Sequence, residues 1–213
     1  DILGIKAAAK INTIVLDEVA KMIKEGITTE DINTLVHNKT IELGGIPAPL
    51  NYNGFPKSVC TSVNDVVCHG IPSKDRILKN GDIINVDCTT ILDGYYADAS
   101  RMFIIGEVSD EVKKLISVTK ESIDLVVKNL KPFDTVGDIG YMINKYVTKF
   151  GFSIVREIGG HGVGNDFHEE PFIAHVGKKE EGMILVTGMV FTIEPMVNIG
   201  SRHDYLDETD EWR

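Results

Sequence analysis

Residues Ile5 to Lys24 carry apolar side chains at the three- and four-residue spacing of an amphipathic helix, and a glycine soon after them is a typical helix stop. Thr28 or Thr29, followed by acidic residues, predicts the start of a second helix that runs to about Leu43. Two glycines follow, and the stretch 47–56 is rich in proline, asparagine and glycine. We therefore expect two helices and then a loop.

Strand-forming stretches come next. The segments Ser58–Val63 and Val66–Ile71 flank Asn64-Asp65, and the segments Asp82–Leu92 and Tyr95–Ile105 flank Asp93-Gly94. Asp-Gly between two such segments is a strong indication of a two-residue hairpin turn. We therefore expect two hairpins in this part of the chain.

Helical spacing returns from about Val112 to Leu130, and a proline then breaks it. Thr135 predicts the start of another helix, which runs to about Phe150 and ends at a glycine. We expect strands again over Ser153–Ile158, near Phe172 and over Met189–Val197.

Both halves of the chain, about 1–106 and 107–213, thus run from two helices into strands. This order suggests an internal duplication, although it also arises by chance, and no clear repeat is visible residue by residue. No linker rich in serine or proline separates the halves. We therefore expect one domain over residues 1–213.

Composition narrows the class of protein. Hydrophobic residues make up 43% of the 213, which is enough to build a core. No apolar run approaches the ~20 residues that cross a membrane, and the charged stretch Asp1 to Lys10 does not have the pattern of a signal peptide, so we expect neither feature. A net charge of −10 argues against DNA binding. Three cysteines without a CxxC pattern favour reduced, buried thiols and an intracellular location.

The hairpin around Asp93-Gly94 places two carboxylates together. A two-residue loop pairs Leu92 with Tyr95 and puts Thr89 opposite Asp98. Asp87 shares a face with Thr89, so Asp87 and Asp98 become diagonal neighbours about 7–8 Å apart. Two carboxylates on one face repel, and a divalent cation relieves that repulsion. The alternative, a surface aspartate in a register shifted by one residue, stays open.

The glycine-rich segment GHGVGNDFHEEP, residues 160–171, contains His161 and His168. It resembles a phosphate-binding loop only weakly, because it opens no helix and no basic residue follows. Two histidines in such a segment favour a polar cleft. Ordinary surface or core positions are expected for His37, His175 and His203.

Glu194 lies in the apolar stretch FTIEPM, where a buried carboxylate needs a partner, and His69 lies in CHGIP at a strand end. Two aspartates, a glutamate and one or two histidines form a mixed oxygen and nitrogen donor set. That set suits a pair of Mn, Fe, Co or Zn ions better than a thiolate-rich zinc site. A water bridging such a pair becomes a hydroxide nucleophile near neutral pH.

Four motifs in this order, CHGIP, NVDCTTILDGYYADASRMF, GHGVGNDFHEEP and GMVFTIEPMV, resemble the type I methionine aminopeptidases over essentially the whole chain. The resemblance implies the pita-bread fold, an α/β architecture of two pseudo-symmetric halves with a curved antiparallel sheet and covering helices. It also implies metal-dependent removal of the initiator methionine from nascent proteins, by hydroxide attack on the first peptide bond, in the cytoplasm.

The resemblance also implies roles for individual residues. Ligands of two divalent ions (Co, Mn, Fe or Zn) are matched by Asp87, Asp98, His161 and Glu194, with Asp98 as a bridge and Glu194 also counted as catalytic. His69 matches a histidine that contacts the substrate near the scissile bond. His168 matches one that stabilises the peptide carbonyl. The methionine pocket is matched by Tyr52, Phe55, Cys60, Phe167 and Trp212.

One family feature has no match. A fifth ligand, a bridging glutamate, lies on a final strand beyond the equivalent of Trp212, whereas the sequence ends at Arg213. Glu208 and Glu211 lie in a turn-like stretch and are not favoured as replacements. Two interpretations stay open: the sequence is part of a chain that is longer at one or both ends, or the chain is truncated at Arg213 and the metal pair is weak or absent.

Two alternatives remain. The first is an Xaa-Pro aminopeptidase-like enzyme of the same fold, although such relatives usually carry a separate N-terminal domain and differ near CHGIP. The second is a metal-depleted, non-catalytic binding protein. A type II enzyme is not favoured, because it has a helical insertion where residues 198–212 resemble the short type I connection. The expected partners are N-terminal peptide substrates, nascent chains and the ribosome, with no DNA, no membrane and a monomeric state.

Overall fold

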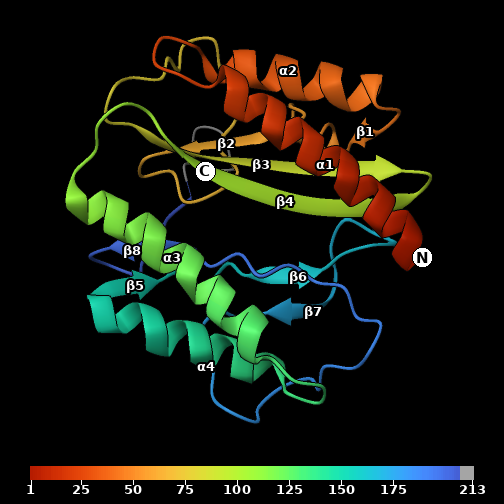
Figure 1. Ribbon diagram of the computed structural model, residues 1–213, viewed down its shortest axis with the longest axis vertical. Coiled ribbons are helices and arrows are strands. Elements are labelled where there is room, and N and C mark those ends of the chain that lie inside the picture. Colours follow the sequence, from red (N-terminus) through yellow and green to blue (C-terminus); the bar gives the residue numbers. More distant parts are fainter. Residues whose placement is uncertain (207–213) are drawn as a thin grey trace. The chain divides into compact units, whose positions relative to one another are not determined.

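The computed structural model describes residues 1–206 (Figure 1). These residues group into two compact units. The first consists mainly of Asp1–Ser109 and also takes in the later segment Gly164–Phe167. The second consists of Asp110–Val163 and His168–Asp204. Each unit has its own hydrophobic core.

The first unit contains α1 (Ile2–Met22), α2 (Thr29–Glu42), β1 (Ile46–Pro47), a 3-10 turn (Tyr52–Gly54), β2 (Cys60–Val63), β3 (Ile83–Leu92) and β4 (Tyr95–Ile104). All strand pairs are antiparallel: β4 lies along one edge of β3, while β1 and β2 pair with the two ends of the other edge. Helix α1 lies across the β3–β4 hairpin (Figure 1). Apolar residues of both helices, including Val15, Val19 and Ile32, pack on Ile84 and Val86.

The second unit contains α3 (Asp110–Asn129), α4 (Val136–Val147), a 3-10 turn (Thr148–Phe150), β5 (Phe152–Ile154), β6 (Gly160–Gly162), β7 (Glu169–Ile173) and β8 (Val197–Ile199). β5 pairs with β8 and β6 with β7, both antiparallel. The apolar faces of the two helices, including Val126, Ile139 and Ile143, enclose a core with Ile154 and Ile173.

The second helix of each unit begins in the same way. Thr28 and Thr135 are N-caps whose hydroxyls accept the backbone N–H of Asp31 and Asp138, over 3.1 and 3.3 Å. Each aspartate in turn accepts the N–H of its threonine over 2.8 Å. These reciprocal capping boxes satisfy N–H groups that a helix start otherwise leaves unpaired.

Two short segments of the chain lie at matching positions relative to the two capping threonines. Thr28 forms an isolated β-bridge with Ile77, and Thr135 forms one with Ile184. Counted from those isoleucines, ILKNGDIINVD aligns with ILVTGMVFTIE. The fifth residue of each is a glycine with φ of 95° or 101°, which a side chain would strain. Asp87 and Glu194 both occupy the eleventh position of these segments, so the two proposed ligands lie at matching places relative to the glycine and the β-bridge of each unit.

Two predicted strands are wrong. Val66–Ile71 is not a strand, because His69 has φ of 55° and the next residue, Gly70, packs against the backbone of Thr61. Most of Met189–Val197 is also outside regular strands, although Val190 and Thr192 exchange single hydrogen bonds with the segment containing β6. β6 itself was not predicted, because its glycines carry no strand propensity.

The predicted hairpin over residues 82–105 is confirmed. Leu92 pairs with Tyr95 and Thr89 pairs with Asp98, as a two-residue turn requires. The four predicted helices are also present within a few residues of their expected ends. Among the described residues, every helix is too short or too polar to cross a lipid bilayer.

Candidate metal and substrate site

In the first unit, the β3–β4 register places Asp87 and Asp98 on one face of the hairpin. Asp98 lies opposite Thr89, and Asp87 is two residues before Thr89 on the same strand. The hydroxyl of Thr89 donates a hydrogen bond to Asp98 Oδ1 over 2.9 Å. Both aspartates are half-buried, so each carboxylate is partly shielded from water while facing outward from the strand pair.

A buried amide fixes the backbone beside both carboxylates. Asn12 of α1 is 1% exposed, and its Nδ2 donates to the carbonyl oxygens of Cys88 and Ala97, each over 2.7 Å. The hydroxyl of Thr90 donates to Asn12 Oδ1. Cys88 follows Asp87 and Ala97 precedes Asp98, so one side chain ties the helix to the two strands that present the aspartates.

Cys60 lies opposite Asp87 in the β2–β3 register. Burial raises the pKa of the Cys60 thiol, and the negative charge of Asp87 raises it further, so the thiol is protonated at neutral pH. Cys88 is buried and its pKa is raised for the same two reasons. The expectation of buried thiols therefore holds for these two, whereas Cys68 is only partly buried.

His69 is presented by a turn that is packed against β2. Its φ is 55°, and Gly70 accepts a hydrogen bond from Thr61 N over 2.7 Å while its N–H donates to Ser62 Oγ over 3.2 Å. A side chain at position 70 would lie 2.2 Å from Thr61 O, so only glycine fits. Burial lowers the pKa of His69, and the charge of Asp98 opposes that shift, which favours a neutral imidazole.

Aromatic rings gather in the first unit. The ring centroid of Phe167 lies 4.7 Å from that of Tyr52 and 6.1 Å from that of Tyr96. Tyr96 N donates to Gly164 O over 2.8 Å, which holds the segment carrying Phe167 in this unit. Phe55 is buried. Tyr96 was not singled out in the sequence, and Trp212, the remaining predicted pocket residue, lies outside the described residues.

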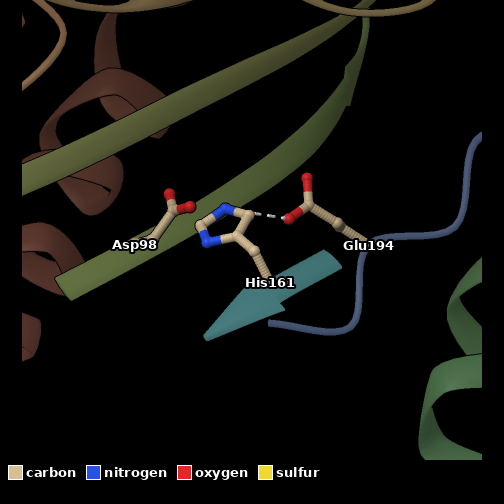
Figure 2. Close-up of side chains that lie close together, drawn as sticks. All are labelled: Asp98, His161 and Glu194. Carbon is tan, nitrogen blue, oxygen red and sulfur yellow. Dashed lines mark ion pairs between the residues drawn. The ribbon is translucent and has the colours of Figure 1, made fainter. Parts of the chain in front are cut away.

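In the second unit, His161 on β6 is turned toward Glu194, with 3.5 Å between His161 Nε2 and Glu194 Oε1 (Figure 2). His161 Nδ1 lies 2.9 Å from the carbonyl oxygen of Gly162. A carbonyl only accepts, so Nδ1 carries the proton and Nε2 keeps its lone pair in the neutral ring. The ring of His168, an exposed residue, lies 4.2 Å from that of His161.

Glu194 is held by two further residues. Thr192 Oγ1 lies 2.6 Å from Glu194 Oε1, and it also accepts the backbone N–H of His161 over 2.9 Å. The backbone N–H of Glu194 donates to His175 Nε2 over 3.2 Å. Glutamate in the motif FTIEPM was expected to need a partner, and these contacts provide it within the second unit.

His175 was expected to be an ordinary histidine and is a core residue, 2% exposed. Burial lowers its pKa to about 4, so it is neutral at physiological pH and can accept the hydrogen bond from Glu194. Nothing in its sequence context indicated this contact, and Thr192 was missed as well. His37 bonds to Ser58 Oγ over 2.8 Å and His203 is exposed, in agreement with the ordinary roles expected of them.

Residues 4–208 match the sequence model of metallopeptidase family M24, and the chain belongs to this family. It is 46% identical over 212 residues to the methionine aminopeptidase of Rickettsia prowazekii, covering 100% of this chain and 82% of that protein. It is 47% identical over 201 residues to methionine aminopeptidase A of Synechocystis, covering 94% of this chain and 79% of that protein.

Comparison with solved structures points to the same family. The crystal structure of the Rickettsia prowazekii methionine aminopeptidase has a TM-score of 0.96 at 45% identity, covering 99% of this chain and 85% of that one. The X-Pro aminopeptidase of Thermotoga maritima has a TM-score of 0.75 at 26% identity, covering 91% of this chain but only 52% of that one. The fold is thus the pita-bread fold expected from the motifs.

Proposed function

We propose that the chain is a metal-dependent aminopeptidase that removes methionine from the N-terminus of peptides and proteins. The observation that carries this proposal is the 46% identity to a methionine aminopeptidase across the whole chain. The same-fold alternative, an Xaa-Pro aminopeptidase-like enzyme, is not favoured, because that likeness is 26% and reaches about half of the larger protein.

The side chains present fit divalent metal ions. Asp98, His161 and Glu194 each offer one ligand atom of a kind that such ions bind (Figure 2). The ring of His161 is already in the required tautomer, since Gly162 O holds the proton on Nδ1 and leaves the Nε2 lone pair available. This donor set argues against a metal-depleted binding protein, because a binding surface needs no such arrangement.

We propose that Asp87 and Asp98 of the first unit, with His161 and Glu194 of the second, are ligands of two ions, with Asp98 as a bridge. The support is the hairpin register that turns both aspartates to one face, and the contact of His161 with Glu194. Oxygen and imidazole donors suit Co, Mn, Fe or Zn. Such a pair, when bound, supplies Lewis acidity and lowers the pKa of water.

The two remaining histidines are proposed to act on the substrate. His69 is held by a turn that packs against β2, and its ring is favoured in the neutral form, so it can accept or donate a hydrogen bond near the scissile bond without carrying a fixed charge. His168 is exposed beside His161 and can donate to the peptide oxygen as negative charge develops there.

The methionine side chain is proposed to contact Tyr52, Phe55, Cys60 and Phe167. In support, the rings of Tyr52 and Phe167 touch, and burial keeps the Cys60 thiol neutral. A thioether is apolar and polarizable, so aromatic faces and an uncharged sulfur suit it. Trp212, the fifth residue proposed for this pocket, is outside the described residues.

The physiological substrates are proposed to be nascent chains emerging from the ribosome, cleaved in the cytoplasm by a monomeric enzyme of type I. The support for this location is chemical: the initiator methionine is exposed on new chains, and the three cysteines are free thiols, as expected in a reducing compartment.

The test is hydrolysis of short peptides by the purified full-length protein with added Mn²⁺ or Co²⁺. Met-Ala and Met-Gly peptides should be cleaved, and Lys-Ala peptides should not, because a lysine ammonium has no partner among apolar walls. Equal rates on peptides with proline second would instead favour the Xaa-Pro alternative. A rate that a chelator leaves unchanged would refute metal dependence.

A further inference from the structure

Thr192 makes three hydrogen bonds that join His161 to Glu194. Its backbone N–H donates to His161 O over 2.8 Å, and its hydroxyl oxygen accepts from His161 N over 2.9 Å. That same oxygen lies 2.6 Å from Glu194 Oε1. Thr192 thus bonds to both the N–H and the carbonyl oxygen of His161, and it also contacts the carboxylate of Glu194.

The direction of the hydroxyl proton follows from these distances. Thr192 Oγ1 has a second acceptor within reach, His161 O, but at 3.4 Å, whereas Glu194 Oε1 is at 2.6 Å. Hydrogen bonds to a carboxylate are shorter and about twice as strong as neutral ones. The single proton therefore goes to Glu194, and the oxygen lone pairs face His161 N.

The close approach is also built into the backbone. A side chain at Gly160 would lie 2.4 Å from Thr192 O and 2.9 Å from Thr192 Oγ1. Glycine at this position lets the strand carrying His161 come against both the backbone and the hydroxyl group of Thr192. Glu194 is also fixed at its backbone, since His175 accepts its N–H over 3.2 Å.

We infer that Thr192 is a positioning residue that holds His161 and Glu194 in one arrangement through a single hydroxyl group. This inference rests on the proposed function, in which both residues are metal ligands. Residues that hydrogen-bond to metal ligands restrict the ligands' rotamers, and losing one typically weakens metal binding about 10- to 100-fold. Thr192 is not among the proposed ligands, so its effect acts through the two residues it holds.

The hydroxyl and the methyl group of Thr192 can be tested separately. Thr192→Val keeps the shape and removes the hydroxyl, and it should weaken Mn²⁺ binding about 10- to 100-fold, measured by titration calorimetry on metal-free protein. Thr192→Ser keeps the hydroxyl and removes the methyl group, and it should bind Mn²⁺ as the wild type does. If Thr192 acted only through the packing of its methyl group, Thr192→Ser would lose affinity for Mn²⁺ and Thr192→Val would keep it.

Thr119→Val is the matched control, because the hydroxyl of Thr119 bonds to Leu115 O within α3, away from His161 and Glu194. It should leave the affinity unchanged. Co²⁺ absorption spectra provide a readout of ligand geometry without turnover, and they should change in Thr192→Val only. Melting of the metal-free variants shows whether each one is folded.

Wild-type affinity in Thr192→Val, or a tenfold loss in Thr192→Ser, would overturn the inference while leaving the proposed function intact. Where the valine variant fails to fold, Thr192→Ala takes its place: it differs from Thr192→Ser only by the hydroxyl and should bind Mn²⁺ about 10- to 100-fold more weakly than the serine variant, and equal affinity of the two would overturn the inference. A wild-type chain that binds neither Mn²⁺ nor Co²⁺ and cleaves no methionyl peptide would instead overturn the proposed function, and the inference with it.

Discussion

Thr89 and Asp98 face each other across the β3–β4 hairpin, and the threonine hydroxyl donates to Asp98 Oδ1 over 2.9 Å. The carboxylate is therefore oriented by a neighbour that is itself 4% exposed. Orientation of this kind leaves the charge of Asp98 intact while limiting its rotation.

Asp98→Asn should lower both bound metal and peptide hydrolysis more strongly than Cys60→Ser does. The amide keeps the size of the side chain and its hydrogen bond to Thr89, but it removes the negative charge proposed to bridge two ions. Metal content by mass spectrometry and the rate on a Met-Ala peptide measure the difference. Similar losses in the two variants would contradict a bridging role for Asp98.

His161→Ala and His168→Ala should both lower activity, but for different reasons. The first should lose metal, because His161 Nε2 is a proposed ligand atom. The second should keep nearly all its metal and lose about 100- to 1,000-fold in kcat, the usual cost of removing one donor to a developing oxyanion. Equal depletion of metal in both variants would show that His168 is a ligand as well.

Asn12→Ala should destabilise the protein. It leaves the carbonyl oxygens of Cys88 and Ala97 and the hydroxyl of Thr90 without the Asn12 side chain as partner, and each lost bond to a buried polar group costs about 1–3 kcal/mol. Urea unfolding measures the loss. The control is Asn129→Ala on the exposed end of α3, which should change stability by less than about 0.5 kcal/mol.

Thr28→Ala and Thr135→Ala should each lower the free energy of unfolding by about 1 kcal/mol, the typical cost of losing an N-cap. The two values should be similar, because the two capping boxes have nearly the same geometry. Thermal melts of each variant and of the double variant measure this. A large cost at one helix and none at the other would show that the two starts are not equivalent.

Asp138 makes part of the stability depend on pH. Hydrogen bonds from the backbone N–H and the hydroxyl of Thr135, opposed by partial burial, hold its pKa below the ordinary 3.8. A depressed pKa means that the contribution is full above pH 3.8 and is lost as the pH falls through the folded-state pKa. Asp138→Asn should therefore flatten the acid limb of a stability-versus-pH curve, and an unchanged limb would contradict this role.

The sequence allowed the helices and the central hairpin to be predicted because those elements depend on local patterns. Thr28 and Thr135 cap helices and Asp93-Gly94 forms a turn, and each of these effects involves only residues close by in the sequence. The pairing of Thr89 with Asp98 followed from the turn by counting. The four motifs then identified a family that the comparison with known proteins confirmed.

Other parts depended on contacts between distant residues. His69 lies outside a strand because Gly70 packs on Thr61, and a local pattern does not show that approach. Thr192 stands two residues before Glu194, so a shared face could be expected, but its bond to His161 joins segments 31 residues apart. His175 was missed because burial, which sets its role, depends on the whole core.

The hydrogen bonds of Asn12 also bear on how the chain folds as it is made. They join residues that are 76 and 85 positions apart. At synthesis rates of about 5–20 residues per second, α1 leaves the ribosome roughly 4 to 17 seconds before its partner strands. During that interval the apolar face of α1 can pack on α2 but not on the hairpin, so the part of this face that the hairpin later covers is open to chaperones and to aggregation.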